Sequence, residues 1–140
     1  MSDVARMFAA LELVRRRLNK AIPTQQLSLL LAVAENPGIT MPELCRLLDM
    51  PQGTVSRNVK MLSHYIDRSA QGVLRPRGYG LLRTQPDRHN PLALAVYLTG
   101  KGEALVQEIE RILSDRRFRH GGAAVSAGQE VVARPVGLMH

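Results

Sequence analysis

Apolar residues recur every three or four positions through the first third of the chain, which is the spacing of amphipathic helices. This pattern predicts a first helix over residues 3–20, with three arginines at 15–17 near its C-terminal end. It predicts a second helix over 24–36, which the helix-breaking sequence Asn-Pro-Gly at 36–38 ends. The residues expected to line one face of the second helix are Leu27, Leu30, Leu31 and Ala34.

A third, short helix is expected next. Ile39 is placed to form a brief extended bridge before it. Thr40 and Glu43 have the spacing of a capping box, and Pro42 lies inside the first turn, so a helix begins here and ends near Asp49. Its buried stripe is predicted to consist of Leu44, Cys45, Leu47 and Leu48.

A fourth helix is predicted over about 51–65, because Pro51 suits the first helical position. Val55, Val59 and Leu62 follow one another at i, i+4 and i+7, which places them on its inner face. A rotation of about 100° per residue then brings a polar set to the opposite face. Its members are Gly53, Ser56, Arg57, Lys60 and His64.

The rest of the chain predicts a β-hairpin and a last helix. Residues 66–80 are rich in glycine and arginine and are expected to form a mobile basic loop rather than a regular element. Strands are predicted at 81–84 and 92–98, on either side of a turn-rich segment. Thr99 can cap a helix that runs to about residue 117. Its apolar face would hold Leu105, Ile109 and Ile112.

The order of these elements is that of a winged helix-turn-helix, a mainly α fold with a small β-hairpin. A chain of 140 residues is long enough for one such domain. We therefore expect a DNA-binding domain over 1–117, with its first and last helices as dimerisation elements. The Gly/Ala-rich sequence near the C-terminus predicts a disordered tail over 118–140.

The formal net charge is +7, which favours a polyanionic partner such as nucleic acid. No apolar run approaches the roughly 20 residues that a membrane-spanning helix needs, and the first residues lack the apolar stretch of a signal peptide. A cytoplasmic location without membrane contact is expected. Cys45 is the only cysteine, and the four histidines show no metal-ligand spacing with it, so neither a metal nor another cofactor is expected.

The outer face of the fourth helix has side chains suited to DNA. Arg57 can donate two hydrogen bonds to the edge of a guanine. With Arg57, the residues predicted to read bases are Gln52, Thr54 and Ser56. Gly53 allows the backbone to approach a phosphate at the helix N-terminus, and Lys60 is expected to contact another phosphate.

Basic residues gather around this helix and the hairpin. Residues 52–89 contain seven lysines or arginines and only two acids. This excess of five cations predicts a steep dependence of DNA affinity on salt. The residues expected to hold the DNA backbone or to act in the wing are Arg75, Arg77, Arg83, Arg88 and His89.

Three stretches carry a resemblance to a known family. They are Gln-Gly-Thr-Val-Ser-Arg at 52–57, Gly-Leu-Leu-Arg at 80–83 and Leu-Thr-Gly-Lys-Gly-Glu-Ala-Leu at 98–105. In this order and spacing they resemble the multiple-antibiotic-resistance regulator (MarR) family of winged-helix repressors. The resemblance covers about residues 5–117. It implies a homodimer that binds a palindromic operator in double-stranded DNA, often released by a small ligand, although no aromatic and polar cluster marks a pocket for such an effector.

The chain departs from that family pattern at three places. Residues 67–77 form an insertion after the fourth helix. The third position of the family's Asp-x-Arg wing motif is His89, after Asp87, with Arg88 as a substitute. The sequence beyond His120 does not predict the further dimerisation helix of the family, which leaves that role to the first and last helices.

The sequence gives no indication of an enzyme, since no carboxylate pair, Ser/His/Asp arrangement or phosphate-binding glycine loop occurs in a suitable setting. The favoured interpretation is a dimeric transcriptional repressor. Two alternatives remain open. A replication or partition factor of a mobile element would protect an origin rather than a promoter. A winged-helix protein-interaction module would bind DNA weakly and with little dependence on salt.

Overall fold

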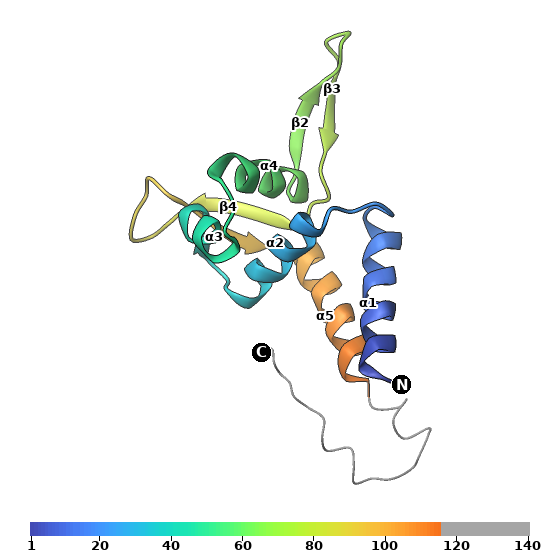
Figure 1. Ribbon diagram of the computed structural model, residues 1–140. Coiled ribbons are helices and arrows are strands. Elements are labelled where there is room, and N and C mark those ends of the chain that lie inside the picture. The colour runs from blue at the N-terminus through green and yellow to red at the C-terminus, as the bar shows by residue number, and fades with distance from the viewer. Residues whose placement is uncertain (116–140) are drawn as a thin grey trace. The chain divides into compact units, whose positions relative to one another are not determined.

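The computed structural model describes residues 1–115, so the predicted tail at 118–140 lies outside the described part (Figure 1). Its helices are α1 (Asp3–Arg17), α2 (Thr24–Glu35), α3 (Met41–Leu48), α4 (Gln52–Leu62) and α5 (Gly100–Ser114). Its strands are β1 (Ile39–Thr40), β2 (Tyr65–Arg68), β3 (Leu74–Arg77), β4 (Leu82–Pro86) and β5 (Leu94–Leu98). The described residues fall into two compact units, 14–107 and 1–13 with 108–115, and α1 and α5 each contribute to both.

The unit of residues 14–107 is a winged helix-turn-helix, as the order of predicted elements indicated. Its helices α2, α3 and α4 share one core with a small sheet, and aliphatic side chains fill that core. Burial of such side chains is the main favourable term in folding. The buried set includes Leu29, Leu30, Val33, Leu44, Val55, Val59, Leu62, Leu82 and Val96.

Specific local structure marks both ends of α3, and the turn from α3 to α4 is short. At its start, the Thr40 hydroxyl accepts a hydrogen bond from the Glu43 amide at 3.3 Å, and the Thr40 amide donates to the Glu43 carboxylate at 2.9 Å. This is the predicted capping box. The bond from the Thr40 amide also lowers the pKa of Glu43. At the other end Asp49 is left-handed, with φ 52°, so the chain reverses and α4 follows after two residues.

The buried faces of α2 and α3 differ from the predicted ones. In α2 the buried residues are Gln26, Leu29, Leu30 and Val33, whereas Leu31 is exposed. The segment 27–34 is apolar on nearly every side, so its periodicity could not single out a face. In α3 Leu44 is buried, but Cys45 and Leu48 are half-buried and Leu47 is 56% exposed. In this helix of eight residues, only Leu44 is fully buried against neighbouring elements.

The wing is part of a three-stranded antiparallel sheet in the order β1-β5-β4. Ile39 and Thr40 pair with Val96 and Ala95, so the link between α2 and α3 joins the sheet. Strands β4 and β5 pair from Leu82 with Leu98 to Pro86 with Leu94, which confirms the hairpin predicted within residues 81–98.

The start of the last helix was also predicted correctly. Thr99 caps α5, because its hydroxyl accepts a hydrogen bond from the Gly102 amide at 3.1 Å and donates one to the Gly80 carbonyl at 2.6 Å. The helix ends at Ser114 rather than near residue 117.

The prediction of a loop over 66–80 was wrong, because β2 and β3 form an antiparallel hairpin there. The prediction that α4 continues to 65 was wrong for a related reason. The amides of Tyr79, Gly80 and Leu81 donate to the carbonyls of Met61, Ser63 and Leu62, at 3.0, 3.2 and 2.7 Å. These bonds occupy carbonyls at the helix end, so α4 stops at Leu62 and the chain turns into β2.

Glycines allow the close approach at the base of this hairpin. Gly78 has φ 96°, and a Cβ at this position would lie 1.8 Å from the Ser63 carbonyl oxygen. Gly80 has φ 72°, and a Cβ there would lie 2.5 Å from the His64 ring. Positive φ favours glycine, and neither site has room for a side chain. Both glycines therefore fix where the hairpin leaves α4.

The other unit contains the N-terminal part of α1 and the C-terminal part of α5. Ala10 and Ile109 are buried in it. Arg6 is also buried, and its guanidinium contacts Asp3 and donates to the Met1 carbonyl at 2.7 Å. In contrast, four large apolar residues of α1 are between 41% and 79% exposed, namely Val4, Met7, Phe8 and Leu11.

The capping box yields a first test. Thr40→Ala should lower the free energy of unfolding by about 1 kcal/mol, because the α3 N-terminus loses its side-chain acceptor. The matched control is Thr24→Ala, which removes an exposed hydroxyl from the first turn of α2, where no side chain caps the helix. Urea unfolding measures both, and equal losses in the two variants would mean that the cap does not stabilise α3.

The base of the hairpin yields a second test, with Gly72 in the hairpin turn as the matched position. Gly72→Ala should cost about 1–2 kcal/mol, because Gly72 has φ 82° but only the end of the Arg68 side chain nearby. Gly78→Ala should cost more, because the Ser63 carbonyl must also move. Urea unfolding and amide exchange of residues 79–81 measure the difference. Full protection of these amides in Gly78→Ala would show that the close approach is not needed.

Candidate nucleic-acid interface

Helix α4 has one buried face and one exposed face. Val55, Val59 and Leu62 are at most 3% exposed, as the sequence predicted. The predicted outer residues Gly53, Ser56, Arg57 and Lys60 are exposed, as is Gln52, while Thr54 is half-buried. His64 was also predicted on this face; it is exposed but lies beyond the end of α4 at Leu62. The exposed face of α4 is therefore polar, and its buried face packs on an aliphatic core.

The first turn of α4 has unoccupied backbone donors. Pro51 is the N-cap, and no side chain accepts a hydrogen bond from the amides that follow it. Helix N-termini of this kind bind phosphate through their amides and dipole. The Arg57 guanidinium lies back over this turn, 3.5 Å from the Thr54 hydroxyl and 3.5 Å from where a Gly53 Cβ would stand. A Cβ at Gly53 would be in ordinary van der Waals contact with the guanidinium, so the arginine by itself does not require glycine here.

A buried polar contact on the inner face of α4 was not predicted from the sequence. Asn58 is 8% exposed, and its amide donates to the Gln25 side chain of α2 at 3.4 Å. An asparagine between apolar positions gives no periodic signal, which is why the sequence pattern could not reveal it. The contact helps to set the rotation of α4 against α2.

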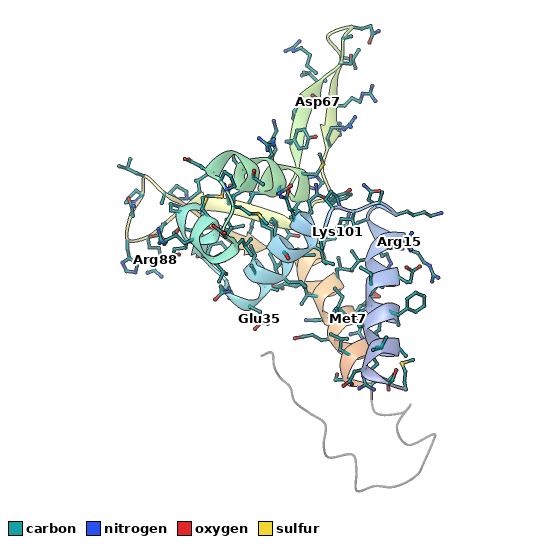
Figure 2. All side chains as sticks on the ribbon, in the orientation of Figure 1. Met7, Arg15, Glu35, Asp67, Arg88 and Lys101 are labelled. Carbon is teal, nitrogen blue, oxygen red and sulfur yellow. The ribbon has the colours of Figure 1, made fainter. Side chains whose placement is uncertain are left out.

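The tip of the wing is ordered by Asp87. Its carboxylate accepts hydrogen bonds from the amides of His89 and Asn90 at 3.1 and 3.0 Å. Asn90 in turn accepts a bond from the Leu92 amide at 3.3 Å. Arg88 and His89 are exposed on this turn, and Figure 2 shows Arg88 at the end of the wing. The substitution of histidine in the wing motif therefore leaves the turn itself intact.

Arg83 occupies the flat face of the wing rather than its tip. Its guanidinium lies 4.6 Å from the centre of the Tyr97 ring, on the paired strand, and donates to the Gln85 side chain at 2.8 Å. Stacking on an aromatic ring leaves part of a guanidinium available to other acceptors. Arg83 is thus an exposed cation in a defined position.

The remaining basic residues lie on the β2–β3 hairpin. Arg75 and Arg77 are both in β3, and both are exposed. The Lys60 ammonium of α4 stands 4.8 Å from the centre of the Tyr65 ring in β2. Sequence reasoning missed Tyr65 as a link between helix and hairpin because it was assigned to the end of α4.

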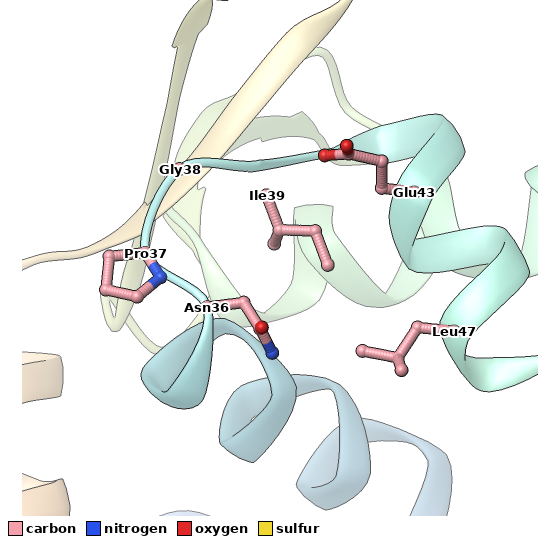
Figure 3. Close-up of a pocket in the computed structure, with 6 residues that line it drawn as sticks. All are labelled: Asn36, Pro37, Gly38, Ile39, Glu43 and Leu47. Atoms are coloured by element: carbon pink, nitrogen blue, oxygen red, sulfur yellow. The ribbon is translucent and has the colours of Figure 1, made fainter.

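A shallow pocket of about 470 Å³ lies where α2 leads into α3 (Figure 3). Its lining residues are Asn36, Pro37, Gly38, Ile39, Glu43 and Leu47. The two polar side chains are already engaged, since Glu43 bonds to Thr40 and the Asn36 amide donates to the Ala32 carbonyl at 2.9 Å. The pocket therefore offers no converging polar groups to fix a small ligand.

Metal binding and membrane insertion are two further possibilities to consider for residues 1–115. No group of three or more His, Cys, Asp or Glu side chains in that range could hold a metal ion. None of the helices there is long and apolar enough to cross a membrane.

Comparison with known proteins identifies the helix-turn-helix. The family model of the MarR family matches residues 22–63, from just before α2 to the end of α4. A search of the curated proteins returns no match.

Three solved structures illustrate the likeness of fold. A MarR transcriptional regulator from Methanosarcina mazei Go1 shows 17% identity over 91% of this chain and 82% of its own, with a TM-score of 0.53. A cysteine-to-serine mutant of MarR from E. coli, complexed with operator DNA, shows 16% identity over 90% and 81%, with a TM-score of 0.52. Overoxidized AbfR bound to DNA shows 21% identity over 81% and 72%, with a TM-score of 0.51. The segment 22–63 therefore matches the MarR-family model, and the chain has the winged-helix fold of these solved structures.

Proposed function

We propose that the chain is a sequence-specific transcriptional regulator that binds double-stranded DNA through α4 in the major groove. The observation that carries this proposal is the division of α4 into a buried aliphatic face and an exposed polar face around Arg57. The structural likeness to MarR complexed with operator DNA and to AbfR bound to DNA supports it. A recognition helix needs both a fixed orientation and an outer face without a packing role.

Base reading is assigned to the first two turns of α4. Arg57 is the principal reader, with two hydrogen bonds to guanine. Gln52 and Ser56 are exposed beside it and can bond to adjacent base edges. Thr54 is half-buried and holds Arg57 while it offers its methyl group to a thymine.

Phosphate contacts position the helix. The amides of the first turn, next to Gly53, bind a phosphate at the α4 N-terminus. Lys60 binds another from the last turn of the helix. Arg83 from the face of the wing contacts the backbone, and Arg88 and His89 from its tip lie along the adjacent minor groove.

The proposed active form is a homodimer built through α1 and α5. Val4, Met7, Phe8 and Leu11 recur at helical spacing on α1 and are exposed, although large apolar side chains normally avoid water. A second copy is the natural cover for such a stripe. Two recognition helices would then read a palindromic operator with half-sites about 34 Å apart.

Repression follows from occupancy alone. A protein bound across a promoter blocks polymerase without catalysing a reaction. Repression of this kind therefore needs no enzymatic activity. Such a regulator acts where the genome lies, which is the reason to propose a cytoplasmic location.

The reading role of α4 is tested by selecting bound sequences from a random DNA pool. Arg57→Ala should lose specificity at one base pair and weaken binding of the wild-type operator by about 1–3 kcal/mol. Lys60→Ala is the matched control on the same face, and it should weaken binding about equally for all sequences. Recovery of the wild-type motif at wild-type strength by Arg57→Ala would exclude α4 as the reader.

The dimer is tested by light scattering after size-exclusion chromatography. Met7→Glu should convert the dimer to a monomer, because it places a charge in the proposed apolar interface. Leu31→Glu is the control, since Leu31 is an exposed leucine on α2 outside that stripe. A dimer that persists in Met7→Glu would rule out this face of α1.

A further inference from the structure

The β2–β3 hairpin is a separate two-stranded sheet, and it is not one of the helices or wing strands that make up the winged helix-turn-helix. It projects from the C-terminal end of α4, whereas the tip of the wing lies toward the N-terminal end (Figure 1). Figure 2 shows the same separation, with Asp67 on the hairpin and Arg88 on the wing. Both β-elements start near the C-terminal end of α4, but their tips therefore lie toward opposite ends of the proposed recognition helix.

The pairing of the strands gives the hairpin two different faces. Tyr65 pairs with Arg77 and Asp67 pairs with Arg75, and these four residues share one face because side chains alternate along a strand. The other face holds Ile66, Arg68, Leu74 and Pro76. One face is therefore polar and basic, while the other is largely apolar.

The basic face continues the outer face of α4. The Lys60 ammonium lies over the Tyr65 ring at 4.8 Å, and Tyr65 is directly opposite Arg77. Cations thus follow one another from the helix to Arg77 and on to Arg75. Within residues 1–115 neither of these arginines forms an ion pair or a side-chain hydrogen bond, so both guanidinium groups are available to a ligand.

The hairpin is held firmly enough to act as an arm. Three backbone hydrogen bonds join residues 79–81 to the C-terminal end of α4. The close approach of Gly78 to the Ser63 carbonyl also restricts movement at the base of the hairpin. Four residues at about 3.3 Å each, with the turn beyond them, extend roughly 15 Å from the helix. That reach exceeds the width of a minor groove, about 6 Å.

From these observations we propose that β2–β3 is a second DNA-contacting arm, in which Arg75 and Arg77 bind phosphates beyond the C-terminal end of α4. The proposal rests on the proposed function, because it takes α4 to lie in the major groove. Guanidinium groups match the geometry of phosphate oxygens, and the hairpin carries three arginines against one aspartate. The arm lengthens the footprint of each half-site on the side away from the wing.

The arm makes a quantitative prediction about salt. Each phosphate contact contributes about 0.9 to the slope of log affinity against log salt concentration. Arg75→Gln/Arg77→Gln should therefore lower the slope by about 1.8, which is about a 3.5-fold smaller loss of affinity for each doubling of salt. Asp67→Asn removes the acid from the same face and should tighten binding.

The experiment uses full-length protein and the duplex selected by the wild type. Fluorescence anisotropy at several salt concentrations gives the slope, and hydroxyl-radical footprinting gives the nucleotides whose backbone sugars are protected. The expected result for Arg75→Gln/Arg77→Gln is the lower slope together with loss of protection at one edge of each half-site. The control Lys20→Gln removes a positive charge from an exposed position between α1 and α2, outside the proposed DNA contacts and the proposed dimerisation helices, and should change neither.

The outcomes separate the arm from the recognition helix. Wild-type binding with an unchanged slope and footprint in Arg75→Gln/Arg77→Gln would overturn the arm and leave the proposed function standing. Absence of sequence-specific binding by the wild type would overturn both. Equal melting temperatures of Arg75→Gln/Arg77→Gln and Lys20→Gln are expected, because all three side chains are exposed.

Discussion

The packing of α4 against α2 and α3 is the constraint on which the other features of this protein depend. Val55, Val59 and Leu62 are almost fully buried, and Asn58 adds a polar contact to α2. These contacts fix the rotation of the helix about its axis. The packing of the buried face therefore determines which residues form the exposed face. The hydrogen bonds from residues 79–81 to the end of α4 then position both the wing and the inserted hairpin relative to it.

This arrangement separates specificity from affinity. In the proposed interface, base-reading side chains lie on a short helix, whereas most of the basic residues between 52 and 89 lie on two β-elements beside it. Phosphate contacts set the register of a protein on DNA, and base contacts determine the sequence that it prefers. A change in either β-element can therefore alter affinity and footprint while the preferred sequence remains the same. As proposed here, the inserted hairpin would lengthen the contacted operator without a new recognition helix.

Much of the helical scaffold could be predicted from the sequence because its signals are local. The capping box at Thr40 and Glu43 and the capping role of Thr99 each depend on residues within a few positions of one another. The inner face of α4 also followed from simple periodicity. The outer residues of α4 were predicted to be exposed, and they are. Their roles in DNA binding remain proposals.

The β2–β3 hairpin could not be predicted in the same way. Its strands have four residues each, and glycine, proline and arginine in β3 and beside it favour a loop on propensity alone. What forms it is the pairing of β2 with β3 and the fastening of residues 79–81 to α4, which are tertiary contacts. The apolar stripe of α1 presents another limit, because its periodicity predicts a buried face, whereas Val4, Met7 and Phe8 are exposed.

The central claim, that the outer face of α4 meets DNA, is tested most directly by an NMR titration. Isotope-labelled protein would be titrated with its selected duplex while the backbone amide signals are followed. The account predicts the largest shift changes at residues 52–57 and 60, with further changes at 88 and 89 in the wing. Changes confined to the pocket between α2 and α3, with the signals of α4 unmoved, would contradict it.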